Sequence, residues 1–138
     1  MKCCFEYEGK PYELNKDNLI EIINDEVNPI EDINIELILN LLNEGTEVEF
    51  DKAYYSTPCE KCGANFKEKK SISEYLEYYF YVYTKNGKYV ISDISKEYEG
   101  LTFNKLQLQG KVDNSYIVTV IVCKNCSKYL VQIEELEI

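Results

Sequence analysis

The chain has 138 residues and a formal net charge of −10, and it contains neither histidine nor arginine. The missing histidine excludes an imidazole base, metal ligand or proton relay, and the missing arginine removes the side chain best suited to bidentate phosphate recognition. The length suits a single domain over residues 1–138, with an acidic part at 1–58 and a neutral part at 59–138.

The negative charge lies almost entirely in the first part. Residues 1–58 hold 14 acids and 4 lysines, a balance of −10, whereas residues 59–138 hold 11 of each. Such a field repels nucleic acid and anionic membranes and favours a basic protein partner. A solvated acidic surface that only maintains solubility is the alternative interpretation.

The sequence indicates a cytoplasmic protein. No apolar run reaches the roughly 20 residues that a membrane helix needs, and the N-terminus reaches a carboxylate at Glu6 without the apolar core of a secretory signal. Thiols stay reduced in the cytoplasm, so paired cysteines there indicate metal or redox chemistry. Lysine as the sole cation, with abundant Asn, Ile and Tyr, is typical of a bacterial protein from an AT-rich genome.

The first elements read as a hairpin followed by two helices. Aromatic or apolar residues alternate with polar ones around Phe5 and around Tyr12, and Gly9 interrupts the pattern, which predicts a short β-hairpin. Residues 16–45 then predict two helices, the first with Asn18 and Glu21 as a capping pair. The second has Asn28 as its cap, Pro29 at its first position, a broad apolar stripe and a stop at Gly45.

Strands dominate the remainder of the predicted structure. Alternating or continuous apolar runs predict strands near residues 48–50, 75–83, 89–91, 101–108, 116–122 and 129–133. Asn86-Gly87 predicts a hairpin turn, and a short helix capped by Ser73 is an alternative for the start of 75–83. The order is β-β-α-α-β followed by mostly antiparallel strands. We therefore expect an α+β fold, a mostly antiparallel sheet with two N-terminal helices.

Two cysteine pairs form the clearest motif. Cys59 and Cys62, and likewise Cys123 and Cys126, are separated by two residues, so each pair can reach two corners of a tetrahedron from one tight turn. Four thiolates suit one structural Zn²⁺ ion. Gly63 follows the first pair, where a turn often needs positive φ, but Ser127 takes that place in the second.

These two motifs and their flanking strands resemble the zinc-ribbon group, which places one such turn on each of two hairpins. The resemblance does not cover the helical segment 16–45, and the 60 residues between Cys62 and Cys123 exceed the insert of a compact ribbon. It implies a sheet that returns the chain to the first turn. In size and composition the chain is also similar to small clostridial proteins of unknown function.

Two other interpretations of the cysteine pairs remain open. One is a redox pair, which normally opens a helix in a thioredoxin-like unit, and the other is fortuitous burial. Cys3 and Cys4 are adjacent on a predicted strand and point to opposite faces, so we expect one buried and one partly exposed thiol rather than ligands.

The sequence predicts no enzyme. A four-cysteine zinc site has no open coordination position, and the glycines form no phosphate-binding loop. Adjacent carboxylates lie where solvated faces are expected: Asp25 and Glu26, Glu31 and Asp32, Glu134 and Glu135.

Two surfaces are candidates for binding. Lysines surround the cysteine pairs, with aromatic residues nearby, which would suit nucleic acid or would merely offset the thiolate charge. They are Lys61, Lys67, Lys69, Lys70, Lys124 and Lys128, with Tyr54, Tyr55, Phe66 and Tyr129. The five tyrosines within 75–83 should alternate between the core and the other face, which is either an ordinary sheet face with hydroxyls at the solvent edge or a surface for a protein partner.

We therefore expect a non-enzymatic, zinc-stabilised binding or adaptor protein whose partner is another protein, and the acidic part of the chain favours a basic one. A nucleic-acid-associated zinc ribbon is the first alternative and a thiol redox protein the second.

Overall fold

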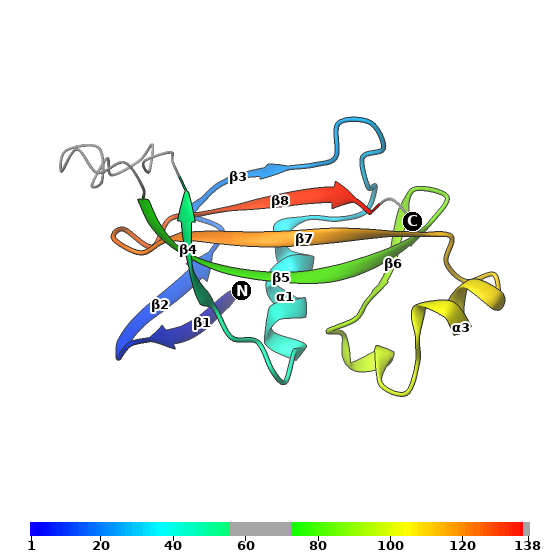
Figure 1. Cartoon of the computed structure of the whole chain (residues 1–138), viewed down its shortest axis with the longest axis horizontal. Helices are drawn as coiled ribbons and strands as arrows, with labels where there is room; N and C mark the ends of the chain where they lie inside the picture. Colours follow the sequence, from blue (N-terminus) through cyan, green and yellow to red (C-terminus); the bar gives the residue numbers. More distant parts are fainter. Residues whose placement is uncertain (56–72, 137–138) are drawn as a thin grey trace.

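The structure is a computed structural model that describes residues 1–55 and 73–136 and consists mainly of β-strands (Figure 1). A small sheet pairs β1 (Lys2–Tyr7) with β2 (Lys10–Asn15). A large sheet contains β3 (Leu19–Ile23), β4 (Asp51–Tyr55), β5 (Ser73–Lys85), β6 (Lys88–Ser92), β7 (Asn114–Cys123) and β8 (Tyr129–Glu135). The described helical segments are α1 (Ile35–Glu44), the 3₁₀ turn η1 (Lys96–Tyr98) and α3 (Phe103–Leu108).

The large sheet is mixed, with the order β3-β8-β7-β5-β4. The β3–β8 pair is parallel and the other pairs are antiparallel. The long strand β5 pairs with β7 along one side, and with β4 and β6 at opposite ends of its other side. The sheet therefore takes strands from both the acidic and the neutral part of the chain.

The main core lies between this sheet and a layer made by α1 and the β1–β2 hairpin (Figure 1). Its fully buried members include Leu14 from β2, Ile38 from α1, and Phe80 and Val120 from the sheet. A second cluster, Tyr83, Ile91, Leu106 and Val112, packs α3 onto the sheet near β6. Tyr83 alternates with the core residue Val82, so this cluster lies on the opposite face.

The expected first helix is wrong, because residues 19–23 form strand β3. Three of its five residues are isoleucine, whose branched Cβ favours extended backbone. Asn18 caps no helix; its side chain donates to the carbonyls of Glu13 and Ser127. This contact with a residue 109 positions away and the pairing of β3 with β8 both stabilise the extended conformation.

The expected second helix begins later than predicted and ends where predicted. Asp32 has a left-handed φ of 63°, so no helix runs through it, and α1 starts at Ile35 with Asn34 as its cap. The Asn34 side chain accepts a hydrogen bond from the Leu37 amide at 2.9 Å. Gly45 follows the last turn, and its amide donates to Leu41. The α+β fold with two N-terminal helices is therefore corrected to β-β-β-α-β in this region.

Replacing Asn34 with alanine tests this helix start. Loss of the cap should lower the free energy of unfolding by about 1 kcal/mol, measured by urea denaturation. Asn40→Ala is the control, because Asn40 is exposed within α1 and alanine has the higher helix propensity. Equal effects of the two changes would place the helix start elsewhere.

Two expected strands also differ from the structure. Residues 103–108 form α3, because Thr102 caps the Lys105 amide and Phe103 and Leu106 are spaced to face one side of a helix. Near residues 48–50 no strand forms, and β4 begins at Asp51.

The other elements agree with the prediction. The N-terminal hairpin, the strand through 75–83, the turn at Asn86-Gly87 and the strands covering 116–122 and 129–133 are all present. Asn86 and Gly87 both have positive φ, as this hairpin turn requires. The helix alternative at Ser73 is excluded, since β5 starts there.

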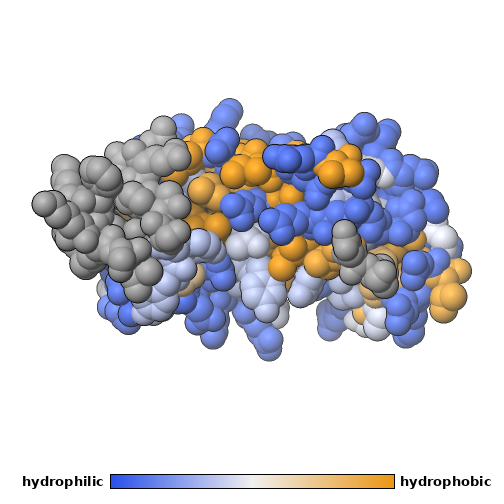
Figure 2. All heavy atoms as spheres, turned by 45° about the horizontal axis from the view of Figure 1, so that its top comes forward, coloured by the Kyte–Doolittle hydropathy of each residue, from blue (hydrophilic) through white to orange (hydrophobic). Residues whose placement is uncertain are grey.

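Hydrophilic residues cover most of the face in Figure 2, and hydrophobic residues form separate patches between them. Exposed large apolar side chains among the described residues are scattered, for example Val27 on a loop and Leu108 at the end of α3. Scattered residues of this kind are ordinary on protein surfaces. No helix among the described residues is long and apolar enough to cross a membrane.

Candidate metal half-site and acidic cleft

The second cysteine pair lies in the tight turn between β7 and β8. Cys123 is the last residue of β7 and is buried, and Cys126 is half-buried within the turn. The Cys123 amide donates to the Lys128 carbonyl at 2.8 Å, and the Ser127 amide donates to the Cys123 carbonyl at 3.0 Å. These bonds close the backbone around the two sulfur-bearing residues. We call residues 123–128 the cysteine turn.

Ser127 has a φ of 66°, the left-handed conformation for which the first pair carries Gly63. The turn thus adopts the backbone shape expected of a metal-binding pair, although serine is less suited to it than glycine. From the sequence, a left-handed conformation at Ser127 could be expected only by analogy with Gly63, which follows the first pair.

Replacing Ser127 with glycine should therefore raise the free energy of unfolding. Relief of the left-handed strain at this residue should stabilise the folded state by about 1–2 kcal/mol. The greater conformational freedom of glycine in the unfolded chain should offset about 0.5–1 kcal/mol of this gain. Ser127→Ala is the control and should show no such gain. Destabilisation by glycine in a thermal melt would contradict the left-handed assignment.

The cysteine turn is held from outside by the N-terminal segments. The Lys10 ammonium and the Tyr12 hydroxyl donate to the Lys124 carbonyl at 3.0 and 3.1 Å. The Asn18 amide side chain donates to the Ser127 carbonyl at 3.0 Å. Residues from β2 and from the start of β3 thus fix the end of the sheet where Cys123 lies.

Lys124 makes its own contacts within the protein. Its ammonium lies 3.4 Å from a Glu74 carboxylate oxygen and 3.9 Å from one of Glu8, and 5.7 Å from the centre of the Tyr7 ring. Desolvation lowers the pKa of Lys124, but the hydrogen bond and charge of Glu74, with the charge of Glu8, outweigh it and raise that pKa. This lysine neutralises carboxylates, which makes it a poor phosphate contact.

The first cysteine pair, Cys59 and Cys62, lies outside the described residues, as do Phe66 and the lysines Lys61, Lys67, Lys69 and Lys70. The described flanks are informative. Tyr55 at the end of β4 pairs with Ser73 at the start of β5, and Tyr75 pairs with Cys123. The chain therefore leaves the sheet after Tyr55 and re-enters it at Ser73, both at the end of the sheet that carries the cysteine turn.

The described residues contain no group of three or more cysteine, aspartate or glutamate side chains placed to hold a metal ion. They contribute Cys123 and Cys126, two of the four predicted ligands. A complete zinc site therefore stays a prediction from the sequence.

Cys3 and Cys4 behave as expected for neighbours on a strand. Cys3 is buried in the main core and Cys4 is exposed. Burial, with a smaller effect from Cys4, raises the pKa of the Cys3 thiol to about 11, so it stays protonated at neutral pH. Cys3 therefore serves in core packing and not as a candidate ligand, because it packs as a small apolar side chain.

The tyrosines of β5 divide between the two faces as predicted. Tyr78 packs against Phe50 and Phe80 in the core, and Tyr83 joins the second cluster. Tyr79 is 53% exposed and lies edge-on to Tyr81. One half-exposed ring with a partly buried neighbour is a smaller surface than the sequence allowed.

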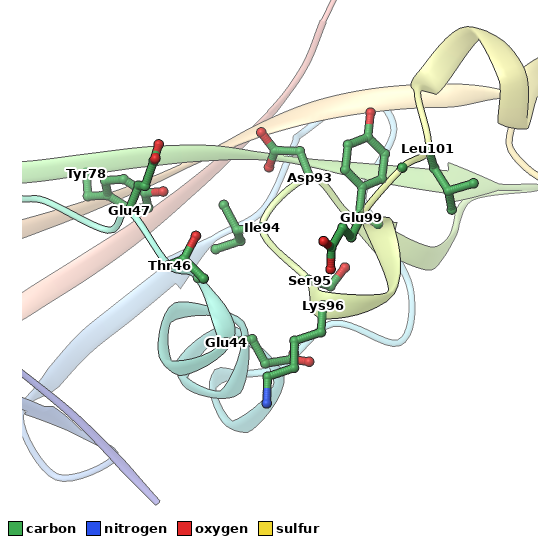
Figure 3. Close-up of a pocket in the computed structure, with 13 residues that line it drawn as sticks. Glu44, Thr46, Glu47, Tyr78, Asp93, Ile94, Ser95, Lys96, Glu99 and Leu101 are labelled. Carbon is green, nitrogen blue, oxygen red and sulfur yellow. The ribbon is translucent and has the colours of Figure 1, made fainter.

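An acidic cleft of about 630 Å³, which the sequence did not predict, lies where the end of α1 faces the segment after β6 (Figure 3). Its carboxylates are Glu44 and Glu47 from one side, and Asp93 and Glu99 from the other, with Lys96 as the cation among its lining residues. In Figure 3, Ile94 lies between Thr46 and Asp93. The C-terminal end of α1 adds its negative partial charge, which no basic residue in the last turn offsets.

Asp93 is the most constrained carboxylate of this cleft. The Tyr81 amide donates to it at 3.0 Å, and the Ser92 hydroxyl lies at 3.5 Å. Burial raises the pKa of Asp93 despite these hydrogen bonds. Burial, then the charges of Asp93 and Glu47, also raise the pKa of Tyr78 in the cleft wall. The cleft therefore has a negative potential and an aromatic side.

Comparison with known proteins identifies the family but no activity. No curated protein and no solved structure matches the chain. The matching family model is not one of the zinc ribbons; it is described as "Protein of unknown function (DUF3785)" and covers residues 3–138. The chain belongs to this family.

Proposed function

We propose that this protein binds one structural Zn²⁺ ion through Cys59, Cys62, Cys123 and Cys126 and acts as a non-enzymatic binding or adaptor protein in the cytoplasm. The observation that carries the metal proposal is the cysteine turn, which has the closed backbone of a metal-binding pair and a left-handed residue, Ser127, directly after its second cysteine.

Chain length supports the participation of the first pair. Adjacent strands are about 4.8 Å apart, and β5 lies between β4 and β7. Tyr55 on β4 is therefore about 10 Å, or two strand spacings, from β7. Cys59 follows Tyr55 by four residues, which can span up to about 13 Å. Both pairs can therefore meet at one end of the sheet.

Cobalt substitution tests the four-thiolate site. Co²⁺ added to the reduced apo-protein should give the visible and charge-transfer absorption of tetrahedral thiolate coordination, and zinc should displace it. Cys59→Ser and Cys126→Ser should each weaken the charge-transfer band, whereas Cys4→Ser should not. Octahedral cobalt in the unaltered protein would refute the site, and reversible formation of two disulfides with retained fold would favour redox chemistry instead.

The acidic cleft supports a basic protein as the partner. A lysine or arginine side chain would find four carboxylates, the end of a helix and the tyrosine ring of Tyr78 there. By contrast, nucleic acid would meet an overall charge of −10, and Lys124 is already engaged by Glu74 and Glu8.

A titration with a short lysine-rich peptide, followed by amide chemical shifts, tests this partner. Shifts should concentrate around Tyr78, Asp93 and Glu99, weaken with salt, and disappear in Asp93→Asn but not in Glu36→Gln, which changes an exposed acid at the far end of α1. Shifts spread evenly over the acidic surface would show that the cleft is not the binding site. Tighter binding of single-stranded nucleic acid than of the peptide would support the nucleic-acid alternative.

A further inference from the structure

Three side chains near the N-terminus hold the two outward carbonyls of the cysteine turn. Lys10 and Tyr12 share the Lys124 carbonyl, and Asn18 takes that of Ser127. The partners are 109 to 114 residues apart in sequence, so folding of the N-terminal segment is what brings them to the turn.

The donors are themselves held in place. The Tyr12 ring is 3% exposed and stacks on Phe5 at 5.1 Å, and the Lys10 ammonium lies 5.0 Å from the centre of the same ring. Asn18 also donates to Glu13 and accepts from the Asn15 amide. Tyr12 is thus fixed by packing and Asn18 by several hydrogen bonds, while the exposed Lys10 lies against the Tyr12 ring.

We propose that Tyr12, Lys10 and Asn18 are positioning residues that fix Cys123 and Cys126 in a metal-ready arrangement before any metal binds, an inference that rests on the proposed zinc site. The Lys124 carbonyl and the following amide belong to one planar peptide unit, so holding the carbonyl also sets the direction of that amide. Less conformational entropy is then lost when the two cysteines bind a metal. The β1–β2 hairpin is therefore part of the metal site without providing a ligand.

Two tyrosine-to-phenylalanine variants separate positioning from general stability. Tyr12→Phe removes the hydroxyl bound to the Lys124 carbonyl, and Tyr116→Phe removes an equally buried hydroxyl bound to the Asn28 carbonyl at 2.8 Å. Tyr116 is near the opposite end of β7 from Cys123. In the metal-free protein, both variants should shift the urea midpoint by similar amounts, because each loses one hydrogen bond of the same type.

Zinc affinity, measured by competition with a chromophoric chelator, is the deciding readout. Tyr12→Phe should raise the zinc dissociation constant about tenfold, as loss of an outer-shell contact does elsewhere, and Tyr116→Phe should change it less than twofold. Equal dissociation constants for the two variants would overturn the positioning role while leaving the zinc site intact. Absence of zinc binding by the unaltered protein would instead refute the proposed function itself.

An exposed pair of lysines provides a second comparison that does not disturb the core. Lys10→Met removes a donor to the turn, whereas Lys2→Met removes the same charge from the same hairpin, where Lys2 pairs with Glu13 at 3.6 Å. We expect weaker zinc binding only for Lys10→Met, and more rapid reaction of the apo-protein's Cys126 with a thiol reagent in that variant. Identical behaviour of both lysine variants would contradict a positioning role for Lys10.

Discussion

Replacement of Cys126 with serine is expected to lower the free energy of unfolding by more than about 4 kcal/mol, because it removes one of four thiolates from a metal that supplies folding energy. Cys126 is half-buried, so the change leaves no large cavity to account for such a loss. Urea denaturation of zinc-loaded protein measures the effect.

The control for that experiment is Cys4→Ser, the same chemical change at an exposed position on β1. It should leave the unfolding midpoint and the zinc content unchanged. In the presence of a strong chelator the two variants should become equally stable. A Cys126→Ser protein as stable as the Cys4→Ser protein in zinc would show that the metal contributes nothing to the fold.

Replacement of Phe50 with alanine is expected to destabilise the protein by about 3–5 kcal/mol. Phe50 is buried between the hairpin and the sheet, with its ring 4.0 Å from that of Phe5 and 5.7 Å from that of Tyr78. Its loss removes the aromatic contact through which β1 rests on β5. The free energy of unfolding from a urea titration measures the cost.

Leu108→Ala is the matched control for Phe50, because Leu108 is 89% exposed on α3 and should change stability by less than about 0.5 kcal/mol. A cost below about 1 kcal/mol for Phe50→Ala would mean that the hairpin is not packed on the sheet. The positioning of the cysteine turn by Lys10 and Tyr12 would then lose its structural basis.

The strands and turns that the sequence predicted well have local causes. Asn86-Gly87 adopts positive φ by its own chemistry, and the apolar run 116–122 favours a central strand, which is buried on its core face and partly covered on the other. The segment at Asn18 is different. Its side chain, which the sequence suggested as a helix cap, instead donates to the carbonyls of Glu13 and of Ser127. The contact with Ser127, far along the chain, cannot be read from the local sequence pattern.

The candidate site was predictable only in its proposed ligands. Cysteine spacing identified Cys123 and Cys126, and the structure places them in one closed turn. The supporting residue Tyr12 was not identifiable, because a tyrosine in a hairpin gives no sign of the carbonyl it will meet 112 residues later. The acidic cleft was missed for the same reason, since Glu47 and Asp93 become neighbours only through the fold.

The metal content of reduced, purified protein tests the central claim most directly. Elemental analysis should return about one zinc per chain, and replacement of Cys59 or Cys126 with serine should lower that zinc content. Reduced protein that folds cooperatively and contains no transition metal, even after incubation with zinc, would contradict the account.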